Sequence, residues 1–304
     1  MARAGDSQAR PLLLLGADGQ LGREVAGLAA ARGLSLTGLN RHQLDITQRA
    51  RVKEAVDRGY ATVINAASYT AVDKAESEQD RAMAVNSDGA GYIAEACRDS
   101  GAALIHISTD YVFDGAKGAP YREDDPVHPL NAYGRSKLAG EEAVRAALAA
   151  HVILRTAWVF GAAGSNFVKT MLRLGGARDE LAIVADQFGC PTPAAALAEA
   201  ILAVAAQAGP ANFGTYHCAG AERTSWYDFA HAIFIGQEAL TGRKGPKLRP
   251  IAAADYPSAA HRPADSTLDS SLFQVTFGGG AIDWRRGLED VLRDLLVPQE
   301  GGRT

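Results

Sequence analysis

The chain has 304 residues, a formal net charge of −4 and an apolar fraction of 47%. This length suits one large α/β domain with a smaller lobe, and the weak negative charge gives no sign of a nucleic-acid-binding surface. No apolar run approaches the roughly 20 residues of a membrane helix, and three widely spaced cysteines indicate neither a zinc site nor a disulfide scaffold.

The amino terminus gives no targeting signal. Residues 1–10 are polar, and the apolar run at residues 12–15 is too short for the core of a signal peptide. We therefore expect a cytoplasmic protein whose first ten residues form a loose tail.

Apolar runs of strand length alternate with helical patterns along the first half of the chain. Strands are expected at residues 12–15, 35–39, 62–65, 103–107 and 152–155, and helices at residues 23–32, 52–57, 82–100 and 138–150. Unbroken apolar strands that alternate with helices are typical of a parallel sheet covered on both faces. The sequence therefore predicts an α/β fold with a doubly wound, Rossmann-type parallel sheet.

The pattern loosens from about residue 158, where Gly and Pro become frequent and aromatic residues gather around Trp226 and Trp284. We expect a smaller C-terminal substrate-binding lobe built from about 158–180 and 209–299. The cofactor-binding domain would then comprise 11–157 and about 181–208, with a helix at 194–206 that returns to it.

A glycine-rich loop lies between the first strand and the first helix. Gly16, Gly19 and Gly22 follow a GxxGxxG spacing and enclose Gln20 and Leu21. Glycines let such a turn tighten and let backbone N–H groups approach a pyrophosphate at the helix N-terminus. The position of the loop predicts a dinucleotide site, although a simple strand-to-helix turn has the same pattern.

The end of the second strand bears on the choice of cofactor. An NAD site usually has an acidic residue there for the ribose 2′-OH, whereas this chain has neutral Asn40 followed by Arg41. Arg41 could pair with a 2′-phosphate, which favours NADPH; NADH stays the alternative if Arg41 only faces solvent. Asp45 and Ile46 lie just beyond and are candidates for the adenine side.

The residues Tyr133 and Lys137 form a YxxxK motif, so their side chains lie one helical turn apart on one face. A ketone that accepts hydride becomes an alkoxide and must gain a proton. A nearby ammonium group lowers the pKa of a tyrosine and brings its proton closer to transfer at neutral pH. Thr109, after the fourth strand, would lie at the carboxyl edge of the sheet, where ligands bind. Asn86 is either a relay residue or a polar group that bends its helix.

Longer motifs resemble the dTDP-4-dehydrorhamnose reductase family of extended short-chain dehydrogenases. They lie at residues 65–76, 108–115, 129–134, 155–160, 186–192 and 256–263. The resemblance covers about residues 11–298. It implies NADPH-dependent reduction of the C4 ketone of dTDP-4-dehydro-6-deoxy-L-mannose to dTDP-L-rhamnose.

The resemblance also implies roles for single residues. For the cofactor, the positions are Gly19, Gln20 and Leu21 at the pyrophosphate, Asp45 and Ile46 at the adenine, and Ala66, Ala67, Ser68, Tyr69 and Thr70 along the cofactor path. For the reaction they are Thr109, Tyr133 and Lys137, with Asp110, Tyr111 and Trp158 at the substrate. Arg262 is our own candidate for a diphosphate contact. Trp158 as core packing and Arg262 as a salt-bridge partner stay open.

One departure from the family concerns a metal. Some members carry glutamates that bind a divalent metal between two subunits, and Glu24 matches one of them. Residues 194–196, where such members have an acidic residue, are all alanine. The sequence therefore predicts no metal site, and a homodimer stays open.

Two other functions fit parts of this pattern. A nucleotide-sugar epimerase or dehydratase on the same fold usually needs further acid–base residues near the threonine, and here Asp110 is followed by Tyr111. A regulatory subunit like that of methionine adenosyltransferase is similar in sequence, but an intact Thr109, Tyr133 and Lys137 argue for turnover. Consumption of NADPH with the keto sugar distinguishes these alternatives.

Overall fold

The computed structural model describes residues 11–297. The predicted loose tail at residues 1–10 lies outside the described residues, as do residues 298 and 299 of the predicted smaller lobe. No helix among the described residues is long and apolar enough to cross a membrane.

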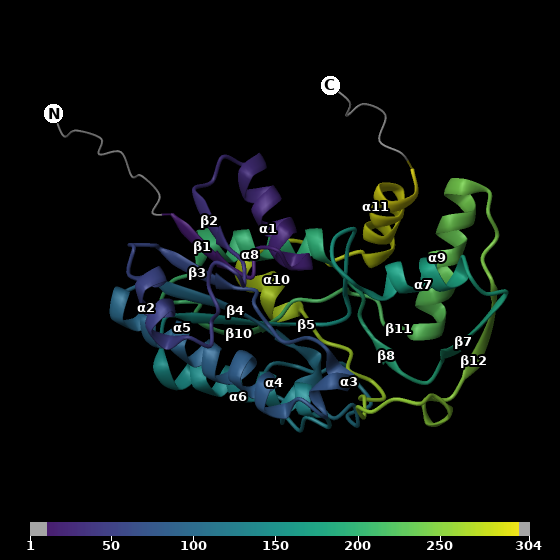
Figure 1. The fold of residues 1–304 in the computed structure, drawn as a ribbon, viewed down its shortest axis with the longest axis horizontal. Helices are drawn as coiled ribbons and strands as arrows, with labels where there is room; N and C mark the ends of the chain where they lie inside the picture. Colours follow the sequence, from purple (N-terminus) through teal and green to yellow (C-terminus); the bar gives the residue numbers. More distant parts are fainter. Residues whose placement is uncertain (1–10, 298–304) are drawn as a thin grey trace.

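A six-stranded sheet forms the centre of the larger lobe, with the strand order β10-β5-β4-β3-β1-β2 (Figure 1). All neighbouring strands in it are parallel. The strands are β1 (Leu12–Leu15), β2 (Leu36–Leu39), β3 (Thr62–Asn65), β4 (Ala103–Thr109), β5 (His151–Thr156) and β10 (Gly214–His217). Leu13 and Leu14, which point to opposite faces, are both 0% exposed. The predicted doubly wound α/β fold is confirmed.

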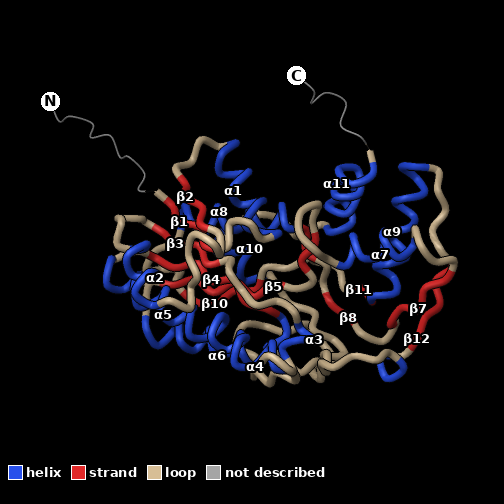
Figure 2. The backbone as a smooth tube through the Cα atoms, viewed as in Figure 1, coloured by secondary structure: helices blue, strands red, loops and turns tan. Residues whose placement is uncertain are grey.

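Helices cover both faces of this sheet (Figure 2). On one face lie α1 (Gln20–Ala31), α8 (Ala194–Gln207) and α10 (Ser271–Phe277), which bury Val25, Ile201 and Phe273 against Leu14. On the other lie α2 (Arg49–Val56), α5 (Gly89–Ser100) and α6 (Ala132–Ala147), which bury Val52, Ile93 and Val144 against Leu13. The alternation of strand and helix in the sequence produces these three layers.

The helix expected at residues 82–100 is a composite of three helical segments. It comprises α4 (Gln79–Met83), a π-helical turn η1 (Ala84–Asp88) and α5, and a short α3 (Val72–Ala75) precedes it. Single π-turns in helices often occur at functional sites. This one contains Asn86, which is 1% exposed, so the bend and the buried amide coincide.

The helix expected at 138–150 begins six residues earlier, at Ala132. Asn131 is its N-cap, because its side-chain oxygen accepts a hydrogen bond of 2.7 Å from the N–H of Gly134. A cap of this kind stabilises a helix by about 1 kcal/mol. The YxxxK motif therefore lies in the first two turns of α6.

The smaller lobe packs around α7 (Phe167–Gly175), α9 (Trp226–Thr241) and α11 (Trp284–Leu296). Its buried centre includes Phe229, Ile233 and Leu288. Short strand pairs complete it, namely β7 (Glu180–Val184) with β12 (Lys247–Ile251) and β8 (Phe188–Gly189) with β11 (Thr224–Ser225), while β6 (Val159–Phe160) pairs with β9 (Thr192–Pro193). The 3-10 turns are η2 (Asp110–Val112) and η3 (Ala253–Asp255).

Three elements pack outside the lobes in which we expected them. Strand β10, expected in the smaller lobe, extends the central sheet beside β5, and α10 packs on the same sheet. Strand β7, expected in the larger lobe, pairs with β12, and its Leu181 joins the core of the smaller lobe. The polar sequence of β10 lacks the apolar run that marked the other strands. The exact division of the chain stays a prediction.

Candidate active site

The glycine-rich loop is packed too closely for larger residues. Gly16 has φ of 84°, and a Cβ atom there would lie 2.7 Å from the backbone nitrogen of Ala67. A Cβ on Gly22 would lie 2.2 Å from the carbonyl oxygen of Gly16. Gly19 is the N-cap of α1 without a side-chain cap, so the first-turn N–H groups of α1 are free of intrahelical partners. The loop thus forms a backbone cradle that fits a dinucleotide pyrophosphate.

The loop is tied to the end of β2. The N–H groups of Gly16 and Ala17 donate to the carbonyl oxygen of Leu39 at 2.9 and 3.2 Å. Asn40 follows, and its side-chain oxygen accepts from the N–H groups of His42 and Gln43, which builds a tight turn. Arg41 is exposed on this turn. Arg41 therefore follows the strand end to which the glycine loop is bonded, and its side chain is exposed.

Asp45 and Ile46 are ordered by local contacts. Asp45 Oδ1 accepts hydrogen bonds from the N–H and the hydroxyl of Thr47 at 3.0 and 2.8 Å. These hydrogen bonds hold the pKa of Asp45 below its ordinary value. Ile46 is 5% exposed and faces Gly89, where a Cβ would lie 2.9 Å from Ile46 Cγ1. An ionised Asp45 on a hydrogen-bonded turn is consistent with the role at the adenine that the family resemblance implies.

Asn86 connects three segments of the site. Its Oδ1 atom accepts from Ser68 Oγ at 2.9 Å and from the N–H of Tyr69 at 2.8 Å. Its Nδ2 atom donates to the carbonyl oxygen of Tyr69 at 3.0 Å and to Ser136 Oγ at 2.9 Å. Gly140 of α6 lies against it, since a Cβ there would be 2.0 Å from the Asn86 carbonyl oxygen. Asn86 thereby fixes the loop after β3 to the helix that carries Tyr133. Thr70, another residue expected along the cofactor path, is exposed.

Thr109 and Asp110 lie at the carboxyl end of β4, both buried. Thr109 Oγ1 donates to Asp110 Oδ1 at 3.0 Å and accepts from the N–H of Tyr111 at 3.2 Å. The other oxygen of Asp110 accepts from Ser266 Oγ at 2.5 Å. Burial raises the pKa of Asp110 to about 7, against the opposing effect of both hydroxyl groups.

Tyr133 and Lys137 extend from the start of α6 toward the same edge of the sheet. The Thr109 hydroxyl lies near enough to Tyr133 to oppose the rise of its pKa, and the Tyr111 ring meets Tyr133 edge-on at 6.1 Å. Lys137 is 2% exposed, and its Nζ donates to the carbonyl oxygen of Ile107 at 2.6 Å. The structure thus brings Thr109, Tyr133 and Lys137 together.

The pKa of Tyr133 is raised, not lowered as we expected from the nearby lysine. Burial, supported by the charge of Asp110, raises the pKa of Tyr133 to about 12. The same burial lowers the pKa of Lys137 to about 8, against the attraction of Glu141. The ammonium group of Lys137 is engaged by the Ile107 carbonyl, and desolvation raises the pKa of Tyr133 more than the Thr109 hydroxyl lowers it. Tyr133 is therefore protonated at neutral pH, as a proton donor must be.

A buried ion pair supports this arrangement from behind. Glu141, 0% exposed, accepts hydrogen bonds from Arg155 Nε and Nη2 at 2.9 and 2.8 Å. Ser108, beside Thr109, donates to Glu141 Oε1 at 2.6 Å. Although burial opposes ionisation, these partners lower the pKa of Glu141 to about 2. The sequence patterns did not indicate Glu141 or Ser266, because their buried partners Arg155, Ser108 and Asp110 are 14 or more positions away in the chain.

A cavity of about 1350 Å³ lies on the side of the smaller lobe; Asp114 and Arg262 line it, whereas Thr109, Tyr133 and Lys137 are not among its lining residues. Trp226 of α9 is among its lining residues, whereas Trp158 is not. Trp158 instead stacks on Trp226, with ring centroids 3.4 Å apart and 7° between the planes. Its φ of 45° is unusual for a bulky residue, and strain of this kind often occurs at functional sites. Trp226, which lines the cavity, was not among the substrate residues expected from the sequence.

Arg262 lines this cavity but is already paired. Its Nη2 and Nη1 atoms donate to the two carboxylate oxygens of Asp73 on α3 at 2.7 and 3.1 Å. Hydrogen bonding from Arg262 lowers the pKa of Asp73 to about 2. On the same loop, the carbonyl oxygen of His261 accepts from Asn131 Nδ2 at 2.9 Å. Arg262 therefore joins this loop to the larger lobe, which is the salt-bridge alternative left open above.

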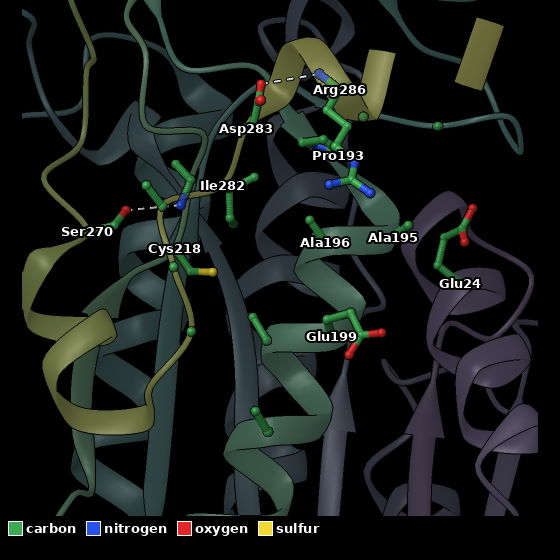
Figure 3. A pocket seen from close by; sticks show the side chains of 18 of the residues that line it. Glu24, Pro193, Ala195, Ala196, Glu199, Cys218, Ser270, Ile282, Asp283 and Arg286 are labelled. Carbon is green, nitrogen blue, oxygen red and sulfur yellow. Dashed lines mark hydrogen bonds between the residues drawn. The ribbon is translucent and has the colours of Figure 1, made fainter. Parts of the chain in front are cut away.

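A second cavity, of about 570 Å³, lies between α1, α8 and α11. Figure 3 shows Glu24 on α1 opposite Ala195 and Ala196 on α8. Glu199, one turn further along α8, is paired with Arg32. Burial and the charge of Asp294 raise the pKa of Glu24. Among residues 11–297, no three His, Cys, Asp or Glu side chains group closely enough to hold a metal ion.

Comparison with known proteins gives a consistent family assignment. A family model described as the RmlD substrate binding domain matches residues 10–297. The curated dTDP-4-dehydrorhamnose reductase of Aggregatibacter actinomycetemcomitans is 44% identical over 288 residues, which cover 92% of this chain and 97% of that protein.

Two solved structures are similar over nearly the whole chain. The dTDP-4-dehydrorhamnose reductase of Clostridium acetobutylicum is 39% identical with a TM-score of 0.88, covering 94% of this chain and 99% of that chain. The enzyme of Bacillus anthracis, solved in complex with NADP, is 35% identical with a TM-score of 0.87 and the same coverage.

Proposed function

The chain belongs to the RmlD substrate binding domain family, and on that basis we propose that it is an NADPH-dependent reductase of a nucleotide-linked keto sugar. The substrate is dTDP-4-dehydro-6-deoxy-L-mannose, and the product is dTDP-L-rhamnose. The observation that carries the proposal is the meeting of Thr109, Tyr133 and Lys137 at the carboxyl edge of the sheet, beside the glycine cradle.

NADPH, when bound, supplies the hydride for C4 of the sugar. Tyr133 then donates its proton to the oxygen that becomes an alkoxide, and its pKa near 12 keeps that proton in place until it is needed. Thr109 aligns the same oxygen by a hydrogen bond. Lys137, whose Nζ donates to the Ile107 carbonyl, would hold a ribose hydroxyl of the bound cofactor.

The cofactor site is proposed along the edge formed by β1, β2 and β3. Gly16, Gly19 and Gly22 leave room for the pyrophosphate against the backbone, with Gln20 and Leu21 at the start of α1. Arg41, exposed after Asn40, reads the 2′-phosphate. Asp45 and Ile46 hold the adenine side, and residues 66–70 line the path toward the nicotinamide.

The substrate is proposed to extend from Thr109 and Asp110 into the large cavity beside α7 and α9. A cavity of about 1350 Å³ is more than large enough for a nucleoside diphosphate sugar. The Trp158–Trp226 stack would support its aromatic wall, with Trp226 as the member that lines the cavity. Arg262 would reach a diphosphate only by sharing its guanidinium with Asp73.

Two alternatives make different use of the same fold. An epimerase or dehydratase regenerates its cofactor and shows no net consumption of NADPH. A regulatory subunit shows no turnover. Stoichiometric oxidation of NADPH in the presence of the keto sugar supports reduction, whereas conversion of the sugar without oxidation supports the first alternative.

We also propose a cytoplasmic location and keep a homodimer as a hypothesis. The three cysteines Cys97, Cys190 and Cys218 are free and buried, which fits a reducing compartment. The cavity between α1, α8 and α11 is the candidate surface for a second copy, because the family's metal-bridging position Glu24 lies there. Light scattering over a range of protein concentrations tests the dimer.

A further inference from the structure

Ser266 reaches the active site from a segment that is remote in sequence. Its Oγ atom donates to Asp110 Oδ2 at 2.5 Å across 156 positions of the chain. Both residues are 2% exposed. Their contact is therefore shielded from solvent and lies directly beside Thr109.

The backbone around Ser266 is fixed on both sides. The N–H of Ser266 donates to the carbonyl oxygen of Phe188 at 3.0 Å, and the N–H of Phe188 donates to Ala264 at 2.8 Å. The carbonyl oxygen of Thr267 accepts from the N–H of Tyr121 at 2.8 Å. Because these bonds hold the main chain, the Ser266 hydroxyl is presented to Asp110 from a fixed position.

The remaining contacts of Asp110 determine what Thr109 can do. Thr109 Oγ1 is bonded to Asp110 Oδ1 and also accepts from the N–H of Tyr111. A hydroxyl group has a single proton to donate. When Asp110 is ionised, that proton is directed to Asp110; when Asp110 is protonated, Asp110 becomes the donor and the Thr109 proton is free for a substrate carbonyl.

We propose that Ser266 is a positioning residue that holds the Asp110 carboxyl group and sets the direction of the hydrogen bond between Asp110 and Thr109. Through that bond it controls whether Thr109 donates to the carbonyl oxygen. This inference rests on the proposed function, in which Thr109 aligns the oxygen that is reduced.

Tyr133, Tyr111 and Cys190, which face Asp110, do not change charge near neutral pH, whereas Lys137 of the same site has a pKa of about 8. Tyr133 faces it from α6, Tyr111 from η2 and Cys190 from the segment after β8, with Arg262 beyond Tyr111. Burial raises the pKa of Tyr133 to about 12 and that of Cys190 to about 11, and it raises the pKa of Tyr111 as well. The pKa of Asp110, raised by burial to about 7, is lowered in part by Ser266.

The first test is the pH profile of kcat/KM for NADPH-dependent reduction. Ser266→Ala removes a hydrogen bond that favours the ionised carboxylate, so the pKa of Asp110 rises. Because the protonated form is the active one, the alkaline limb should move to higher pH by about one unit. Thr267→Val is the matched control, since the Thr267 hydroxyl donates to Asp265 and not to Asp110; its profile should match that of the wild type.

Asp110→Asn tests whether Ser266 acts through Asp110, because an amide side chain does not titrate in this range. Its profile should lack the limb that belongs to Asp110, and adding Ser266→Ala should produce no further shift. A decline of kcat/KM caused by deprotonation of Lys137, whose pKa is about 8, would persist in both variants. An unshifted limb in Ser266→Ala, or an equal shift in the Asp110→Asn background, would overturn the proposal.

A titration without substrate separates this inference from the function on which it rests. Carbon-13 NMR of labelled aspartates follows the Asp110 carboxyl signal, which is assigned by its absence in Asp110→Asn. The signal should titrate at higher pH in Ser266→Ala than in the wild type. Failure of turnover with every keto sugar contradicts the proposed function, whereas an unchanged NMR titration contradicts the role of Ser266.

Discussion

Lys137 Nζ donates a hydrogen bond of 2.6 Å to the carbonyl oxygen of Ile107, and this bond joins α6 to β4. One turn earlier, Gly134 allows equally close packing, since a Cβ there would lie 2.2 Å from the carbonyl oxygen of Tyr111. These two contacts fix the beginning of α6 against the end of β4. The position of Tyr133 relative to Thr109 is therefore set by backbone contacts as well as by side-chain packing.

Tyr133→Phe should lower turnover by about 10²–10⁴-fold, because it removes the proton donor and leaves the ring in place. NADPH binding, measured by fluorescence titration, should be nearly unchanged. Tyr216→Phe is a matched control, since the Tyr216 hydroxyl donates to the carbonyl oxygen of Asn212 at the far edge of the sheet. Wild-type turnover in Tyr133→Phe would exclude this residue as the acid.

Much of the site could be predicted because its residues lie in continuous motifs. The glycine loop and the YxxxK spacing place Gly16, Tyr133 and Lys137 by local rules of strand and helix geometry. The partners that fix these residues could not be predicted in the same way. Glu141 with Arg155 and Asp110 with Ser266 meet only through the tertiary fold.

The fold shows the same division between local and tertiary information. Of the five strands expected in the central sheet, β1, β3, β4 and β5 were predictable because their apolar runs are buried on both faces, whereas β2 at the sheet edge is only partly buried. Strand β10 was missed because its residues are polar and it pairs only at the sheet edge, beside β5. The pKa of Tyr133 was predicted in the wrong direction because desolvation depends on burial, which a four-residue spacing does not reveal.

Arg41→Ala should narrow the preference for NADPH over NADH, mainly by weakening NADPH. The reason is that Arg41 is exposed on the turn after β2, beside the cradle for the pyrophosphate. The ratio of kcat/KM for the two cofactors measures this effect. Arg49→Ala is the control, because Arg49 is also exposed but pairs with Glu95. An unchanged ratio in Arg41→Ala would show that another residue reads the 2′-phosphate.

Glu141→Gln should destabilise the protein, because it leaves Arg155 buried without its counter-charge. Loss of one partner from a buried pair costs about 3–5 kcal/mol, measurable by thermal or urea unfolding at pH 7. The control Arg145→Met removes a partially exposed partner of the same carboxylate, and exposed pairs contribute about 0–1 kcal/mol. Equal effects of the two variants would contradict the assignment of Glu141–Arg155 as the dominant pair.

The pH dependence of this stability follows from the lowered pKa of Glu141. Its pKa is about 2 in the folded protein and 4.5 ordinarily, so its contribution is fully present above pH 4.5. That contribution is lost as the pH falls through the interval toward 2. The stability difference between wild type and Glu141→Gln should therefore shrink across this interval, and a constant difference would contradict the pKa.

Chelation by EDTA should leave both turnover and oligomeric state unchanged. Ala195 and Ala196 offer no ligand opposite Glu24 (Figure 3). Glu199 is paired with Arg32. A single carboxylate holds magnesium weakly, because this ion requires near-octahedral oxygen coordination. Turnover and light scattering are measured before and after chelation. A loss of either that magnesium restores would reveal a metal site formed by other residues.

The most direct test of the central claim is to follow a deuterium atom from NADPH labelled at C4 of the nicotinamide into the sugar. With dTDP-4-dehydro-6-deoxy-L-mannose as substrate, we predict that the pro-R- or the pro-S-labelled cofactor, but not both, transfers its deuterium to C4 of the product. The product should be dTDP-L-rhamnose, formed in equal amount to the NADP released. Formation of product without oxidation of NADPH, or oxidation without deuterium at C4 from either labelled form, would contradict the account.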